Sequence, residues 1–140
     1  VWEVNVKGYF RLAKASFSHM KKRGGGKIIN VSTLYAENPP PNVCKYVIAK
    51  MGLVGLTRSL AVEFSQHNIQ VNMVVPGFVR TDLTKHVSKI FVENIRHSTA
   101  MKRIATPVDV AKAIIFLGSS LSHFTTGQKI MVTGGSPPFF

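Results

Sequence analysis

The feature that most constrains how this chain folds is a threefold alternation of helical segments with short apolar runs. Apolar residues recur every three or four positions from Val4 to about Arg23, from about Val43 to Ser65, and from Thr106 through Leu117. This spacing places the apolar side chains on one face of a helix, so it predicts three amphipathic helices. The third also opens with a favourable cap and a first-turn proline, Thr106-Pro107.

A short run rich in β-branched residues follows each of these helices. The runs are Lys27–Ser32, Ile69–Val75 and Gln128–Val132, and turn residues lie close to them. Strands that alternate with helices are joined by helical crossovers, which makes neighbouring strands parallel. The sequence therefore predicts a layered α/β fold. Three strands are few for such a sheet, so we interpret the chain as half of a domain.

Glycine and proline mark the connections between these elements. Gly24-Gly25-Gly26 ends the first helix, because glycine readily adopts the left-handed conformation found at helix ends. Pro39-Pro40-Pro41 can neither continue a helix nor donate to a strand, so residues 35–42 are predicted to form a loop. The segment from Phe78 to about Thr106 is polar, weakly periodic and long for a connection. We expect a functional flap there, at residues 80–106, that holds short helical turns.

The charge balance of the chain is strongly basic. Its 140 residues contain 18 Lys and Arg against 6 Asp and Glu, a formal net charge of +12. A surface of this kind attracts polyanions such as nucleic acid, anionic lipid or an acidic protein. The basic residues are nevertheless spread along the chain, and the tightest run is only Lys21-Lys22-Arg23. Nucleic-acid binders concentrate charge on one element with interleaved aromatic residues, so we expect no nucleic-acid partner.

Other function classes are disfavoured by what the sequence lacks. No apolar stretch approaches the ~20 residues that a membrane span needs, so no membrane partner is expected. The first residues show no basic segment leading into an apolar one, so no secretory signal is predicted. The single Cys44 cannot form an internal disulfide, which favours a reducing, cytoplasmic location. The 5 histidines have no metal-ligand spacing with Cys44 or with carboxylates, so no metal site is predicted.

Tyr46 and Lys50 form the most suggestive chemical pair. They stand four positions apart on a predicted helix, so both side chains project from one face. A phenol with an ordinary pKa near ~10 is a poor acid or base at neutral pH. A nearby ammonium group lowers that pKa, which suits proton transfer to or from a hydroxyl or carbonyl oxygen. Taken alone, the pair is more typical of a tyrosine packed over a lysine stem, because such i,i+4 pairs are common on helices.

Further motifs surround this pair in a fixed order. They are Val4-Asn5-Val6-Lys7-Gly8, Thr33 after a strand, Leu56–Glu63, Ile69–Gly77, Thr106–Ala111 and Thr126-Gly127-Gln128. The ordered set resembles the C-terminal half of the classical short-chain dehydrogenase/reductase family, with a pattern closest to 3-oxoacyl-[acyl-carrier-protein] reductases. The resemblance covers nearly all of residues 1–140. It implies a partial Rossmann-like, doubly wound parallel sheet with helices on both faces.

The resemblance also implies a role for each candidate catalytic residue. Tyr46 would be the catalytic acid/base, and Lys50 would lower the pKa of that tyrosine while binding the nicotinamide ribose. Asn5 would hold a water molecule of the proton relay through a local irregularity of its helix. Apart from the resemblance, Asn5 is also compatible with an ordinary helix position that points to solvent.

The cofactor-binding residues implied by the resemblance follow the second strand. The segment from Pro76 and Gly77 to Thr81 is similar to the family's nicotinamide-carboxamide segment, with the backbone at Val79 and the hydroxyl of Thr81 making contacts. Without the family context, a proline and a glycine after a strand would indicate only a turn.

The position of the family's active-site serine is occupied by Thr33. The family's usual spacing, thirteen residues before Tyr46, falls on Thr33, which keeps the hydroxyl donor but adds a methyl group that restricts its rotamers. The neighbouring Ser32 is expected to face the opposite side of the strand, because side chains alternate. A different loop conformation would change that register, so Ser32 stays the alternative donor.

The glycine-rich turn that binds pyrophosphate in this family has no counterpart in the sequence. No G-x-x-x-G-x-G is present, and Gly24-Gly25-Gly26 follows a helix and precedes a strand, which is the reverse of the required order. The resemblance therefore implies that the N-terminal nucleotide-binding half is absent and that residues 1–140 alone are inactive. NADP is slightly favoured over NAD, although the residue that distinguishes them belongs to the absent half.

Two functions follow from the resemblance. The first is hydride transfer between a nicotinamide and a small carbonyl or alcohol substrate. A 3-oxoacyl group on an acyl carrier protein is one candidate, because an acidic carrier would suit the basic chain. The alternative is a non-catalytic oligomerisation or interaction module. In this family the helices that correspond to Val4–Arg23 and Val43–Ser65 form a dimer interface, so a homo-oligomer is expected in either case.

Overall fold

The computed structural model describes residues 1–137. Its three strands are β1 (Gly26–Val31), β2 (Ile69–Pro76) and β3 (Lys129–Val132), and they form one parallel sheet in the order β1-β2-β3. The α-helices of the described residues are α1 (Tyr9–Lys22), α2 (Cys44–Ser65), α3 (Lys89–Ser98) and α4 (Pro107–Gly118). The three predicted strands and the three predicted helices are all present, with bounds that differ by a few residues.

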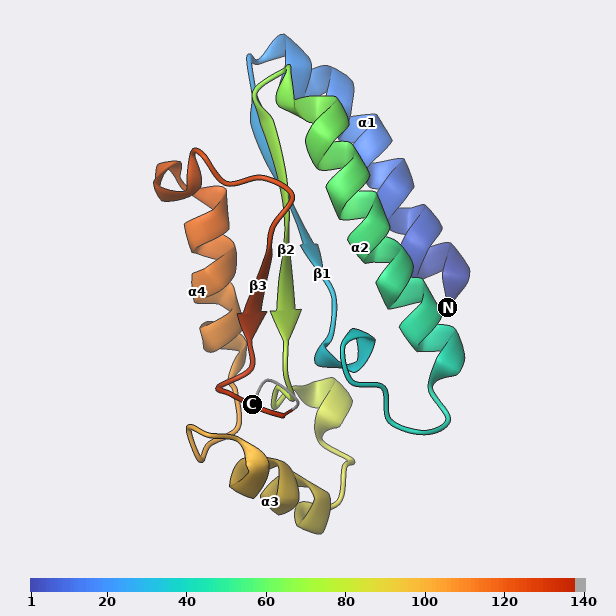
Figure 1. Ribbon diagram of the computed structural model, residues 1–140, viewed down its shortest axis with the longest axis vertical. Helices are drawn as coiled ribbons and strands as arrows, with labels where there is room; N and C mark the ends of the chain where they lie inside the picture. The colour runs from blue at the N-terminus through green and yellow to red at the C-terminus, as the bar shows by residue number, and fades with distance from the viewer. Residues whose placement is uncertain (138–140) are drawn as a thin grey trace.

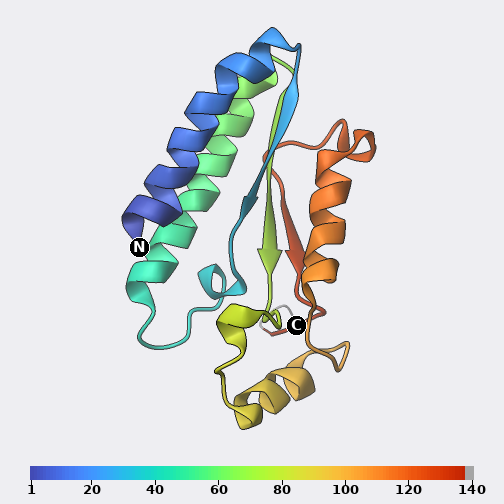
Figure 2. The same cartoon turned by 180° about the vertical axis from the view of Figure 1, so that it is seen from behind.

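The helices cover both faces of the sheet. Figure 1 shows α1 and α2 side by side on one face and α4 on the opposite face, and the reversed view in Figure 2 shows the same layers. The α/β architecture expected from the sequence is therefore confirmed. None of the helices in residues 1–137 is long and apolar enough to cross a membrane.

The core lies between the sheet and α2. Val71, Met73 and Val75 alternate along β2 on the side of this helix, and each is at most 1% exposed. Leu53 and Leu60 of α2 pack in the same apolar clusters. Burying side chains of this size stabilises a fold by about 1.5–3 kcal/mol each, so these contacts hold α2 at a fixed position on the sheet.

A buried polar contact links β1 to the same helix. The Asn30 side-chain amide donates to Thr57 Oγ1 at 2.9 Å, and Thr57 Oγ1 donates to the Leu53 carbonyl at 2.8 Å. Asn30 and Thr57 are both nearly inaccessible to solvent, so each polar group needs a partner of this kind. The contact fixes the carboxyl end of β1 relative to the helix that carries Tyr46 and Lys50.

The predicted flap contains more regular structure than expected. Besides the short 3-10 turn Asp82–Thr84, it includes the ten-residue helix α3, which begins where Ser88 Oγ accepts a hydrogen bond from the Phe91 N–H at 3.2 Å. An isolated parallel bridge between Val79 and Ala105 closes the base of the flap. The segment is thus a folded excursion below the sheet rather than an irregular loop.

Candidate active site

The predicted catalytic residues lie where β1 ends and α2 begins. β1 ends at Val31, Thr33 follows two residues later, and Tyr46 and Lys50 stand on the first two turns of α2. Lys50 is only 6% exposed, and its Nζ donates to the Val31 carbonyl at 2.9 Å. The strand end therefore holds an ammonium group in a largely dry environment.

The ammonium group of Lys50 lies near two tyrosine rings. Its Nζ is 5.8 Å from the ring centroid of Tyr46 and 5.4 Å from that of Tyr9. Burial lowers the pKa of Lys50, because the protonated form loses its hydration. The arrangement places an ammonium group beside a tyrosine hydroxyl, a group that can exchange a proton with a substrate oxygen.

Tyr9 is a residue of this cluster that the sequence analysis did not single out. Its hydroxyl donates to the carbonyl of Val31 at 3.2 Å, the same oxygen that Lys50 uses. Burial raises the pKa of Tyr9, and the nearby Tyr46 raises it further. Tyr9 stands four residues after Asn5, which places both on the same helix face. This spacing is the sequence signal that could have identified Tyr9 as a site residue.

Asn5 lies in an irregular stretch of helix. Residues Glu3–Gly8 wind as a π-helix before α1 begins, so the irregularity implied by the resemblance is present. The Asn5 side-chain amide donates to the Val1 carbonyl at 3.1 Å. The side chain of Val6 lies 3.8 Å from the position that a Cβ on Gly52 would take, so this stretch packs directly against α2.

The two candidate hydroxyl donors differ in their surroundings. Thr33 is partly exposed and caps the 3-10 turn Leu34–Ala36, where its Oγ1 accepts from the Tyr35 N–H at 3.3 Å. Its own hydroxyl proton is therefore available to another acceptor. Ser32 is 6% exposed, and its Oγ has no hydrogen-bond partner among residues 1–137.

The predicted cofactor segment follows β2 directly. Pro76 is the last residue of the strand, and the Gly77 N–H donates to the Val132 carbonyl at 3.0 Å. A Cβ on Gly77 would lie 3.3 Å from Cα of Thr133, so glycine permits this close approach of two chains. Farther on, Thr84 Oγ1 donates to the Val79 carbonyl at 2.9 Å, and Thr81 lies exposed beside it.

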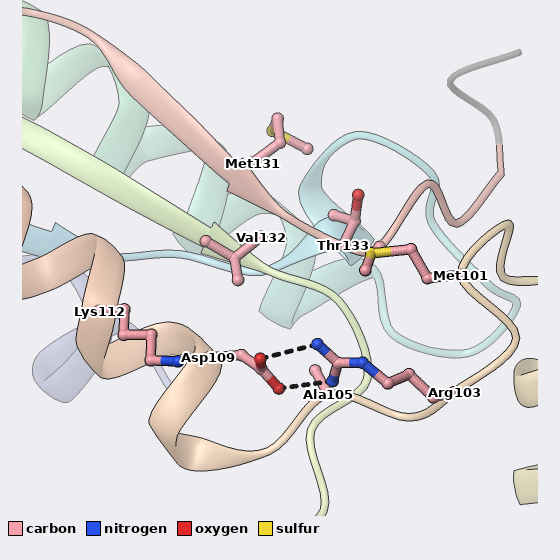
Figure 3. Close-up of a pocket in the computed structure, with 9 residues that line it drawn as sticks. Met101, Arg103, Ala105, Asp109, Lys112, Met131, Val132 and Thr133 are labelled. Atoms are coloured by element: carbon pink, nitrogen blue, oxygen red, sulfur yellow. Dashed lines mark hydrogen bonds and ion pairs between the residues drawn. The ribbon is translucent and has the colours of Figure 1, made fainter.

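A separate cavity of about 270 Å³ lies between the end of β3 and the start of α4. Figure 3 shows Arg103 forming a two-pronged ion pair with Asp109 in its wall, at N···O distances of 2.7 and 2.8 Å. This guanidinium, together with two hydrogen bonds from Thr106, holds the pKa of Asp109 far below its usual range. None of the predicted site residues lines the cavity, so the cavity and the candidate catalytic groups are distinct regions.

Comparison with known proteins identifies the group to which this fold and site belong. Residues 1–136 match the family model described as enoyl-(acyl carrier protein) reductase. The chain is 37% identical over 142 residues to dehydrogenase/reductase SDR family member 4 of Sus scrofa, covering 97% of this chain and 51% of the relative. It is 35% identical over 135 residues to the 3-oxoacyl-[acyl-carrier-protein] reductase FabG of Aquifex aeolicus, covering 96% and 54%.

Solved structures give the same result. A gluconate 5-dehydrogenase from Burkholderia cenocepacia, in complex with NADP and tartrate, superposes with a TM-score of 0.90 at 32% identity. The alignment covers 94% of this chain and 52% of that one. The chain therefore belongs to the short-chain dehydrogenase/reductase family, a family of NAD(P)-dependent oxidoreductases. It spans about half the length of the relatives that it matches.

Proposed function

We propose that this chain supplies the catalytic half of an NAD(P)-dependent short-chain dehydrogenase/reductase. The observation that carries the proposal is the buried Lys50 ammonium, held by the Val31 carbonyl at 2.9 Å and lying 5.8 Å from the Tyr46 ring centroid. A desolvated lysine is energetically unfavourable, and groups of this kind cluster at functional sites. The reaction is hydride transfer between a nicotinamide and a carbonyl or alcohol carbon.

In this proposal Tyr46 exchanges a proton with the substrate oxygen. For carbonyl reduction, the Tyr46 hydroxyl donates its proton to the oxygen, and the Lys50 ammonium stabilises the phenolate that remains. The hydroxyl of Thr33 donates a hydrogen bond to the same substrate oxygen, and Ser32 is the alternative donor. Asn5, in its π-helical stretch, holds a water molecule through which the proton of Tyr46 is replaced.

The residues after β2 suit the nicotinamide end of a dinucleotide. We assign these contacts to Pro76, Gly77, Val79 and Thr81, together with Tyr46 and Lys50. Two features support the fit: the ammonium of Lys50 makes one hydrogen bond in residues 1–137 and has two more protons to donate, and Thr81 is exposed. When bound, the nicotinamide supplies or accepts the hydride. NADP is preferred to NAD in the proposal, in keeping with the relative solved with NADP.

The proposed substrate is a small carbonyl or alcohol compound. A 3-oxoacyl group on an acyl carrier protein is one member of this class, and the net charge of +12 would favour an acidic carrier. The similarity to FabG from Aquifex aeolicus supports this choice. The similarity to the gluconate 5-dehydrogenase supports a polyol or sugar acid instead.

A second candidate is an interaction module that assembles through α1 and α2. Large apolar side chains are exposed on these helices and the stretch before them: Val4, Phe10, Leu12, Ile48, Met51 and Val62. Exposed apolar side chains on two neighbouring helices suit an association surface, so we propose a homo-oligomer. As a purely structural module, the chain would assemble without binding a nucleotide.

The experiment that separates the two candidates combines an intact-mass measurement with a titration by NADPH and NADH followed by fluorescence. Saturable binding, lost in Lys50→Met and retained in Lys112→Met, supports the catalytic assignment. Oligomers that bind neither nucleotide, in the complete protein to which these residues belong, would favour the interaction module.

A further inference from the structure

The loop between β1 and α2, residues 33–42, is held together mainly by its own hydrogen bonds. The backbone N–H groups of residues 35 to 38 all donate to Thr33 or Leu34. Pro39-Pro40-Pro41 have no N–H groups to donate. Within residues 1–137, one hydrogen bond connects this loop to the rest of the protein: Lys129 Nζ donates to Glu37 Oε1.

The contact between Lys129 and Glu37 differs from the other ion pairs of the described chain. Its partners stand 92 positions apart, whereas the other six pairs join residues at most eight positions apart. The side chains of Glu37 and Lys129 are 21% and 36% exposed, so water screens them less than a fully exposed pair. An ion pair between segments this far apart in the sequence restrains one segment relative to the other.

Each partner is well placed for such a restraint. Lys129 opens β3, and its Cα is in register with Met73 in the middle of β2, so its backbone belongs to the rigid sheet. Glu37 ends the 3-10 turn that Thr33 begins, and its N–H donates to the Leu34 carbonyl at 2.9 Å. Because the turn is internally bonded, fixing its last residue also orients its first.

We propose that Lys129, through its ion pair with Glu37, positions the loop so that the Thr33 hydroxyl stays directed to the substrate oxygen. Lys129 is thus a positioning residue, which acts on the reaction through the loop and touches neither substrate nor nucleotide. The inference rests on the proposed function for the role of Thr33. The restraint itself, which we call the tether, is the ion pair between Lys129 of β3 and Glu37 of the loop, and it does not depend on the proposed function.

The first test measures hydrogen–deuterium exchange of the loop amides in Lys129→Met and Glu37→Gln. Lys129→Met removes the donor with a side chain of similar length, and Glu37→Gln removes the negative charge while keeping the length of the side chain. We expect the amides of residues 36 to 38 to exchange about 3- to 10-fold faster in either variant, as suits the loss of one charged hydrogen bond. Lys129→Arg and the double reversal Glu37→Lys/Lys129→Glu should restore slow exchange, and Arg96→Met, which breaks a local pair on α3, should leave the loop unchanged.

The second test measures kinetics of the complete protein with a carbonyl substrate. In Lys129→Met, kcat should fall about 3- to 10-fold while KM for the nucleotide stays constant, and Lys129→Arg should recover most of kcat. Unchanged exchange in Lys129→Met, or faster exchange without any loss of kcat, would overturn the proposal. An unaltered protein that shows no reductase activity would instead refute the proposed function, and the exchange data would still decide whether the tether exists.

Discussion

Two regions near the carboxyl ends of the strands show opposite combinations of shape and chemistry. The cavity beside α4 encloses about 270 Å³, but its charged residues Arg103 and Asp109 form an ion pair with each other. In the corner formed by Val31, Tyr46 and Lys50, the buried ammonium makes its one hydrogen bond within residues 1–137 to a backbone carbonyl. A paired charge stabilises structure, whereas a desolvated cation beside a phenol is typical of functional sites. The largest effects on activity are therefore expected away from the cavity of Figure 3.

The largest predicted effect belongs to Tyr46→Phe. Loss of the proton donor should reduce kcat of the complete protein by about 10³-fold or more, because general acid–base groups contribute on this scale. Circular dichroism should show an unchanged fold, since only one hydroxyl is removed. The matched change Arg103→Met, in the cavity wall, should leave kcat within a few-fold. Substantial turnover by the Tyr46 variant would remove it from the role of acid/base.

Thr33→Ala comes next, with an expected loss of ~10²–10³-fold in kcat, as for one positioned donor. Thr33→Ser keeps the hydroxyl and should retain most of the activity. The comparison with Ser32→Ala decides which neighbour donates the hydrogen bond. If Ser32→Ala loses more activity than Thr33→Ala, Ser32 is the donor.

Lys50→Met tests how much the buried ammonium group of the corner lowers the stability of the fold. Replacing a buried ammonium by an apolar chain of similar length should raise the free energy of unfolding by about 1 kcal/mol. Because burial lowers the pKa of Lys50 in the folded state, the gain should be complete at neutral pH and shrink as the pH rises toward the unfolded value. Thermal unfolding at pH 7 and pH 10 measures both. A destabilised variant at pH 7 would mean that Lys50 is a structural residue.

The smallest effect is expected from Asp109→Asn. The lowered pKa of Asp109 means that its carboxylate stabilises the fold above its unfolded pKa, and that this contribution is lost as the pH falls through the folded value. The variant should therefore unfold at a slightly lower temperature than the unaltered chain at pH 7, and the difference should narrow below about pH 4. A gap that stays constant down to pH 2 would contradict this account of the ion pair.

Local sequence signals predicted much of the fold and part of the site. The spacing of apolar residues located α2, and Thr106-Pro107 marked the start of α4, because caps and periodicity act within one turn of helix. Helix α3 was predicted only as short turns, since its segment showed weak apolar spacing. The contacts of Tyr9 with Val31 and of Lys129 with Glu37 join residues 22 and 92 positions apart, so only the packing of the whole sheet could reveal them.

The parallel order of the sheet has a consequence for how the chain folds as it is synthesised. Gly26 pairs with Ile69 and Met73 with Lys129, so in both cases the pairing residue is synthesised more than forty residues later. Contacts this distant along a chain form slowly, because closing a long loop costs conformational entropy before any stabilising contact is made. Helix α2, which lies between the first two strands, relies on local bonds and can form earlier. Assembly of the sheet, and with it of the corner around Val31, is accordingly among the last events of folding.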